Sequence, residues 1–152
     1  MVKEITLDAT VVNITVITKY VDDILESIGC TLDTQYIIDI VVDELFGNIA
    51  KYAYVDDTGI VTVRFDYNEK SNLVTITFID SGIPFNPLLK ETPDLELSTE
   101  EREIGGLGIY MVKNCVDDIE YEYKDGKNIL TVKKFLNEDV YFWQLLNELI
   151  KY

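Results

Sequence analysis

Two pairs of β-rich segments, each joined by a short polar turn, constrain the fold of this chain most strongly. In the first pair, residues 60–67 and 72–80 alternate apolar and polar side chains and are joined through residues 68–71. The second pair spans residues 119–135, with Asp125-Gly126 at its turn. Short connections join antiparallel strands, because a parallel crossover needs about a dozen residues or more. The sequence therefore predicts a mixed, mostly antiparallel sheet.

The other periodic segments predict one more strand and four helices. Residues 3–8 alternate and are expected to form the first strand. Gly29 is expected to end the first helix, and Asp33 is expected to be the N-cap of the second. The expected helices are residues 11–28, residues 34–54, a helix that follows the glycines at 105–108, and an amphipathic helix in residues 138–152.

This order of elements predicts an α+β fold, with the helices on one face of the sheet in a two-layer α/β sandwich. The chain has 152 residues and is 47% hydrophobic, enough for one domain with a core. We assign residues 1–136 to that domain and residues 137–152 to the appended C-terminal helix. The segment 81–106 holds all three prolines and many acidic residues, and a loop of this length typically forms a lid or a binding loop or is disordered.

Charge and residue content exclude several functions. The formal net charge is −15, which opposes binding to nucleic acid or to an anionic membrane. The chain has no histidine, which excludes Ser-His-Asp and Cys-His catalysis and histidine metal sites within it. Cys30 and Cys115 are far apart and are expected to be buried thiols. No apolar run reaches membrane-spanning length and no export signal is recognisable, so we expect a cytoplasmic protein.

Glu44 and Asn48 form the first candidate constellation. Residues four apart lie on one face of a helix, and this pair sits close to the apolar stripe, whereas Asp39 and Asp43 are expected on the solvent face. An asparagine oxygen suits Mg²⁺, and a carboxylate one turn away can deprotonate a nucleophile. The alternative is an ordinary polar edge of an amphipathic helix.

The second constellation is the run from Asp80 to Phe85, which follows a strand. A carboxylate at the end of a strand can accept a hydrogen bond from an exocyclic amine, and Gly82 lets a flat ligand approach the backbone. The alternative is a plain Asp-x-Gly turn.

The third constellation is Gly105-Gly106-Leu107-Gly108 before a helix, where backbone N–H groups can bind phosphate. Its alternative is a flexible hinge or a helix entry.

Taken together, these three motifs resemble those of the histidine-kinase-like (GHKL) ATPases with the Bergerat nucleotide fold. Glu44-x-x-x-Asn48 is similar to the N box of that family, Asp80-Ser81-Gly82-Ile83-Pro84-Phe85 to its first glycine box, and Gly105-Gly106-Leu107-Gly108 to its second. Within the family, the chain looks most like the bacterial anti-sigma factors that are also serine-protein kinases. The resemblance covers roughly residues 3–136 of the chain.

The resemblance implies ATP and Mg²⁺ as ligands and a role for each residue. Asn48 would bind Mg²⁺, Glu44 would be the general base, and Asp80 would hold the adenine amine beside Gly82. Glycines 105, 106 and 108, with Leu107, would wrap the phosphates, residues 87–104 would form the lid, and Lys51 could meet a phosphate.

The implied function is that of an anti-sigma factor which phosphorylates a serine of an anti-anti-sigma partner and sequesters a sigma factor. Homodimerisation is also suggested by the resemblance. The sequence departs from the family at Tyr52, where a histidine is usual, and at Asn86, where an aspartate is usual. The alternative function is therefore an ATP-responsive module of the same fold that binds its partner without kinase activity. A scaffold that has lost nucleotide binding is a third.

Overall fold

Five antiparallel strands form one sheet in the computed structural model, which describes residues 1–55, 58–89, 107–136, 144 and 146–148. The strand order across the sheet is β1-β2-β3-β5-β4. The strands are β1 (Val2–Asp8), β2 (Ile60–Asn68), β3 (Leu73–Asp80), β4 (Asp118–Lys124) and β5 (Lys127–Phe135). Both predicted hairpins are present, so the expectation of a mostly antiparallel sheet is confirmed.

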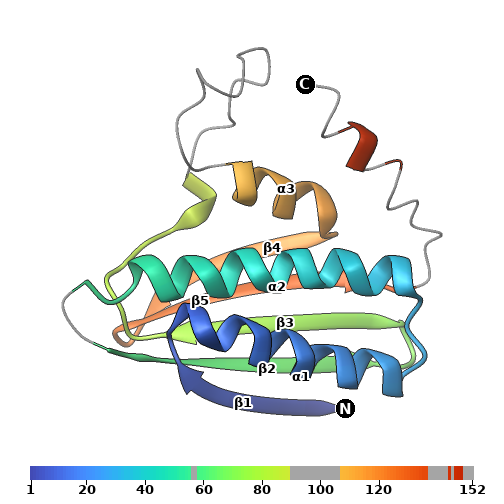
Figure 1. Cartoon of the computed structure of the whole chain (residues 1–152), viewed down its shortest axis with the longest axis horizontal. Coiled ribbons are helices and arrows are strands. Elements are labelled where there is room, and N and C mark those ends of the chain that lie inside the picture. Colours follow the sequence, from blue (N-terminus) through green and yellow to red (C-terminus); the bar gives the residue numbers. More distant parts are fainter. Residues whose placement is uncertain (56–57, 90–106, 137–143, 145, 149–152) are drawn as a thin grey trace.

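Three α-helices pack on one face of this sheet: α1 (Ile14–Ser27), α2 (Leu32–Tyr52) and α3 (Leu107–Cys115) (Figure 1). Every second residue of β3 and β5 is buried, as expected for strands with one face against helices. The fully buried Phe46 of α2 and Phe65 and Phe78 of the sheet belong to one hydrophobic core. The predicted two-layer α/β sandwich is confirmed.

Turn chemistry explains where several elements end. Asp125 and Gly126 have φ of +52° and +74°, the consecutive positive values that a tight two-residue hairpin turn needs. Gly29, with φ of +75°, follows α1, and glycine adopts this left-handed conformation without a steric penalty.

The predicted beginnings of two helices are wrong by a few residues. The N-cap of α2 is Thr31, whose hydroxyl accepts a hydrogen bond from Thr34 N at 3.4 Å. Asp33 instead lies in the first turn, where its negative charge interacts favourably with the positive end of the helix dipole. Residues 11–13 form a separate 3-10 turn before α1, and Val12 there is 82% exposed.

The expectation that Asp39 lies on the solvent face is also wrong. Asp43 is exposed, but Asp39 is half-buried where α2 packs against α1. One oxygen of Asp39 and one of Asp22 are buried without a hydrogen-bond partner among the described residues. The two carboxyl groups are close enough to share a hydrogen bond if one of them is protonated. Asp39 therefore lies half-buried between α2 and α1 and does not face the solvent.

Two predicted segments fall mostly outside the described residues: the C-terminal helix over 138–152, and the lid beyond residue 89. The described start of the lid, Pro87–Leu89, is a 3-10 turn. Lys113 of α3 donates a hydrogen bond to Leu88 O at 3.2 Å, which joins this turn to α3. Within the described part of the chain, no helix combines the length and apolarity needed to cross a bilayer.

Candidate functional site

The turn after β3 is fastened to the C-terminal end of α2. Ile83 N donates to Ala53 O at 2.9 Å, and Ser81 N donates to the Tyr54 hydroxyl at 2.9 Å. Gly82 packs so tightly on Ala53 that an added Cβ would lie 2.4 Å from Ala53 O. Any larger residue at 82 would therefore force the turn away from the helix. These contacts place the two sequence motifs, one on α2 and one after β3, next to each other.

We expect Tyr54→Phe to destabilise the protein by about 1–2 kcal/mol, because two backbone groups lose their partner. The Tyr54 hydroxyl accepts from Ser81 N and donates to Ile60 O at 2.7 Å, so it links α2, β2 and the turn. Urea unfolding measures the change. Tyr123→Phe is the matched control, since Tyr123 is exposed. Equal stability of the two variants would contradict this role of the hydroxyl.

Asp80 is the buried carboxylate of this region, with an exposed fraction of 5%. Its Oδ1 accepts hydrogen bonds from Gly82 N and from Asn128 Nδ2, both at 2.9 Å. Burial raises the pKa of Asp80 above its ordinary value, and these two hydrogen bonds act in the opposite direction because they favour the charged form. The Oδ2 atom has no hydrogen-bond partner within the described residues and remains available to accept one.

Asn128, at the beginning of β5, is a functional candidate that sequence reasoning missed. The β3–β5 register pairs it with Asp80, and its side chain is buried. Besides Asp80 Oδ1, its Nδ2 group donates to Ile83 O at 2.9 Å, while its Oδ1 accepts from Phe85 N at 3.1 Å and from the Tyr121 hydroxyl at 2.5 Å. One amide therefore joins β3, β4, β5 and the turn.

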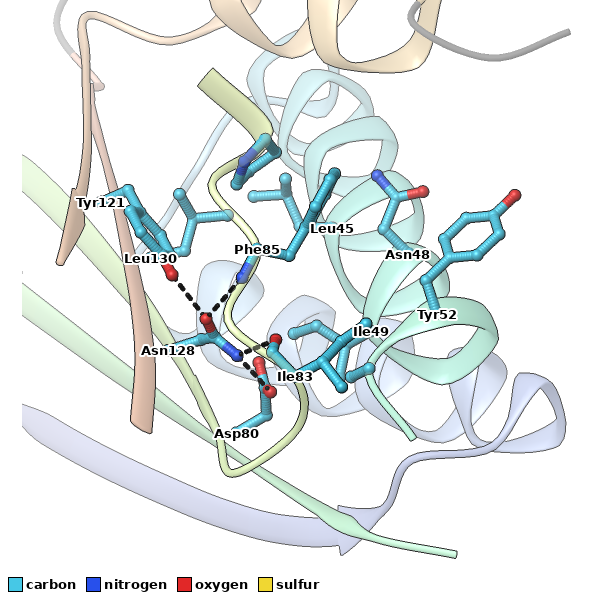
Figure 2. A pocket seen from close by; sticks show the side chains of 12 residues that line it. Leu45, Asn48, Ile49, Tyr52, Asp80, Ile83, Phe85, Tyr121, Asn128 and Leu130 are labelled. Atoms are coloured by element: carbon cyan, nitrogen blue, oxygen red, sulfur yellow. Dashed lines mark hydrogen bonds between the residues drawn. The ribbon is translucent and has the colours of Figure 1, made fainter. Parts of the chain in front are cut away.

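A cavity opens between α2 and this turn (Figure 2). Its polar lining includes Asp80, Asn128 and Asn48, and Tyr52 stands at the rim with 57% of its surface exposed. The other lining residues are largely apolar: Leu45, Ile49, Ala53, Ile83, Phe85, Pro87, Tyr121 and Leu130. Apolar walls with one buried carboxylate suit a flat heterocycle that carries a hydrogen-bond donor.

Glu44 and Asn48 are joined to each other and to α3. Asn48 Nδ2 donates to Glu44 Oε1 at 3.1 Å, which orients the Asn48 side chain. A Cβ added to Gly108 would lie 2.0 Å from the Glu44 carboxyl carbon, so any other residue at 108 would displace the Glu44 carboxylate from its present position. The first turn of α3 therefore lies directly on Glu44. Glu44 itself does not line the cavity; it sits one helical turn from Asn48.

The donor set around Asn48 fits a Mg²⁺ ion that is bound partly by phosphate oxygens. The amide nitrogen of Asn48 is used by Glu44, and no described residue donates to its carbonyl oxygen. Within the described residues there is no cluster of three or more acidic or thiol side chains that would hold a metal alone. A single asparagine oxygen is typical of Mg²⁺ sites completed by water and phosphate.

The structure brings some of the predicted site residues together and leaves others apart. Asn48 and Asp80 line the same cavity, Gly82 supports its turn, and Gly108 contacts Glu44. Lys51 and Leu107 are exposed and do not line the cavity. Glycines 105 and 106 lie outside the described residues.

Known proteins resemble this chain over most of its length. The model of the histidine kinase-like ATPase domain matches residues 7–134. Serine-protein kinase RsbW of Bacillus mycoides (strain KBAB4) is 29% identical over 116 residues, which are 74% of this chain and 71% of the relative. Serine-protein kinase RsbW of Bacillus thuringiensis (strain Al Hakam) is 30% identical over 105 residues, covering 66% of this chain and 64% of the relative.

Solved structures share the fold. The structure of the RsbU and RsbW domains of a Mycobacterium tuberculosis protein superposes with a TM-score of 0.62 at 18% identity, over 90% of this chain and 32% of that one. The blue-light activated histidine kinase of Erythrobacter litoralis EL346 gives a TM-score of 0.54 at 17% identity, over 72% of this chain and 33% of that one. The sequence match and the shared sandwich agree, and this chain belongs to the histidine kinase-like ATPase domain family.

Proposed function

We propose that this protein binds ATP with Mg²⁺ in the cavity beside Asp80 and transfers the γ-phosphate to a serine of a protein partner. The observation that carries the proposal is the convergence of three distant motifs: Asp80 and Asn48 line one cavity, and Gly108 lies against Glu44. The names of the relatives support a serine-protein kinase. The family match supports a nucleotide as ligand.

Each group has a chemical task in this proposal. The free Oδ2 of Asp80 accepts a hydrogen bond from the adenine amine, between the apolar walls of the cavity. Asn48 would hold Mg²⁺, which neutralises phosphate charge when bound. The N-terminus of α3, nine residues long, offers backbone N–H groups and the positive end of its dipole to the phosphates. Glu44 accepts the proton of the serine hydroxyl as it attacks.

The partners follow from the resemblance of the motifs to those of anti-sigma factors. We propose an anti-anti-sigma protein as the phosphorylated partner and a sigma factor as the sequestered one, with a homodimer as the assembly. Local N–H groups would bind the phosphates and a Mg²⁺ ion would neutralise part of their charge, so the net charge of −15 on the whole chain does not prevent an anionic ligand from binding.

Tyr52 favours a second candidate, a module of the same fold that responds to ATP but does not transfer phosphate. This residue stands at the rim of the cavity, one turn from Asn48, where the family usually has histidine. A tyrosine offers no positive charge at neutral pH. Incubation with γ-labelled ATP and an anti-anti-sigma protein from the same genome separates the two candidates. Labelled serine supports the kinase, and nucleotide-dependent complex formation without label supports the module.

A titration with ATP and Mg²⁺ tests nucleotide binding itself. At about 100 times its dissociation constant, the ligand should stabilise the fold by about 2.7 kcal/mol, which differential scanning calorimetry detects. Asp80→Asn should weaken binding by roughly tenfold to a hundredfold, because a hydrogen bond to a charged group is lost. Asp8→Asn, an exposed position on β1, is the matched control. A wild-type transition temperature unaffected by nucleotide would refute the proposal.

A further inference from the structure

Asn128 has an amide whose hydrogen-bonding capacity is completely used. The two N–H bonds of Nδ2 go to Asp80 Oδ1 and Ile83 O, and Oδ1 accepts from Phe85 N and the Tyr121 hydroxyl (Figure 2). An asparagine amide provides two donors and about two acceptor sites, so nothing is left for a ligand. Asn128 therefore acts on other groups of the cavity and does not itself bind a substrate.

The orientation of this amide is fixed by its partners. Rotating it by 180° would set its NH₂ group against the N–H of Phe85 and its oxygen against two acceptors, Asp80 Oδ1 and Ile83 O. Such a rotation would replace three hydrogen bonds by repulsive contacts, whereas the Tyr121 hydroxyl could accept from the rotated NH₂ group. The donor side of Asn128 consequently always faces Asp80.

Fixing Asn128 also fixes Asp80. Its Oδ1 receives two donors, Gly82 N and Asn128 Nδ2, and no described residue donates to Oδ2. Two donors on one oxygen hold the plane of the carboxylate and favour its charged form. Asp80 Oδ2 therefore offers the cavity one hydrogen-bond acceptor with a fixed position and orientation.

We propose that Asn128 is the positioning residue that sets the nucleobase preference of this cavity, by holding Asp80 so that its free oxygen accepts only from a base with an exocyclic amine. This inference rests on the proposed function, because it presumes that a purine nucleotide occupies the cavity. Adenine carries an amine at C6, whereas hypoxanthine carries a carbonyl oxygen there. A carboxylate oxygen accepts from the amine and repels the carbonyl.

The protonation state of Asp80 decides which base is preferred, since a neutral acid could donate to the carbonyl. Burial favours the neutral acid, and the hydrogen bonds from Asn128 and Gly82 favour the carboxylate. Among the described residues, the titratable groups that interact with Asp80 are Tyr54, two residues after α2, and Tyr121 of β4. Burial raises the pKa of each phenol above its ordinary value, so both stay neutral near pH 7. The charge of Asp80 is then set by burial on one side and by the hydrogen bonds from Asn128 and Gly82 on the other.

The test compares ADP with inosine diphosphate by isothermal titration calorimetry on the wild-type chain and on Asn128→Leu. Leucine keeps the approximate volume and removes the amide. We expect wild type to prefer ADP by about 100-fold and the variant to lose about tenfold or more of that preference. A residue that only stabilised the fold would lower both affinities in proportion and leave their ratio unchanged.

A second variant keeps the proposal testable if Asn128→Leu does not fold. Tyr121→Phe removes one donor to the Asn128 oxygen and should reduce the ADP preference by about threefold to tenfold. Tyr123→Phe, two residues along the same strand and exposed, is the matched control and should retain the wild-type ratio.

The outcomes separate this inference from the proposed function. A wild-type chain that binds neither nucleotide overturns both. A wild-type chain that prefers ADP, together with a folded Asn128→Leu that keeps the full preference, overturns the role of Asn128 alone. Loss of preference in Asn128→Leu with retained ADP binding supports it. Where Asn128→Leu does not fold, Tyr121→Phe decides in the same way.

Discussion

Glu44→Gln is expected to reduce phosphate transfer to the partner serine by about 10²–10⁴-fold, the usual contribution of a general base. Glutamine has nearly the same shape, so it still fits against Gly108 and still accepts the hydrogen bond from Asn48 Nδ2. The affinity for ATP should therefore remain close to that of wild type. Single-turnover transfer of labelled γ-phosphate, together with nucleotide titration, measures both quantities.

Asp43→Asn provides the matched control for this variant. Asp43 is adjacent to Glu44 in sequence but exposed, so the substitution changes the net charge of α2 by the same amount without touching Asn48 or Gly108. We expect its transfer rate to remain at the wild-type level. Equal transfer rates for Glu44→Gln and wild type would show that Glu44 is not the general base, even if nucleotide binding were intact.

The sequence contains enough information to predict the two-layer sandwich and two of the residues that line the cavity, Asp80 and Asn48. Alternation identifies β2, β3, β4 and β5, and short polar turns define their antiparallel pairing. Asp80 could be singled out because a charged residue ends an apolar strand, and Asn48 because it lies near the apolar stripe of its helix. Both signals are local in the sequence, so these two residues can be identified without knowing how the strands pair.

Asn128 could not be found in this way because its role depends on register. It is 48 residues from Asp80, and only the pairing of β3 with β5 brings them together. One signal was present in the sequence. Asn128 falls in the alternation that continues with the buried residues Leu130 and Val132, and a polar side chain at a buried position requires partners. The contact of Gly108 with Glu44 likewise depends on how α3 packs against α2.

Asp39 shows the same limit on the other side of α2. Its helical position indicates the solvent face, but the packing of α1 covers it and brings Asp22 alongside. Desolvation, the hydrogen bond with Asp22, and the negative charges of Asp22 and Asp43 raise the pKa of Asp39 to about 7. An amphipathic pattern defines the face of one helix and does not predict which neighbour will cover its edge.

Asp39→Asn is expected to stabilise the protein at pH 8 and to have little effect at low pH. Between about pH 4 and pH 7, native Asp39 retains a proton that the unfolded chain has lost, so the free energy of unfolding falls as pH rises through this window. Above about pH 7 both states are deprotonated and the loss is complete. Asparagine resembles the neutral acid at every pH, so the variant avoids this loss of stability.

The expected gain for Asp39→Asn at pH 8 is on the order of 1–2 kcal/mol, smaller than the full pKa shift implies, because the half-exposed carboxyl is screened by solvent. Urea unfolding at pH 5 and pH 8 measures it, and the wild type should be the less stable of the two proteins mainly at pH 8. Asp23→Asn on α1 is the matched control, since Asp23 pairs with Lys19 on the exposed surface at 2.9 Å. A gain that is equal at both pH values would assign the effect to reduced net charge, because only a proton held between Asp22 and Asp39 makes the benefit grow with pH.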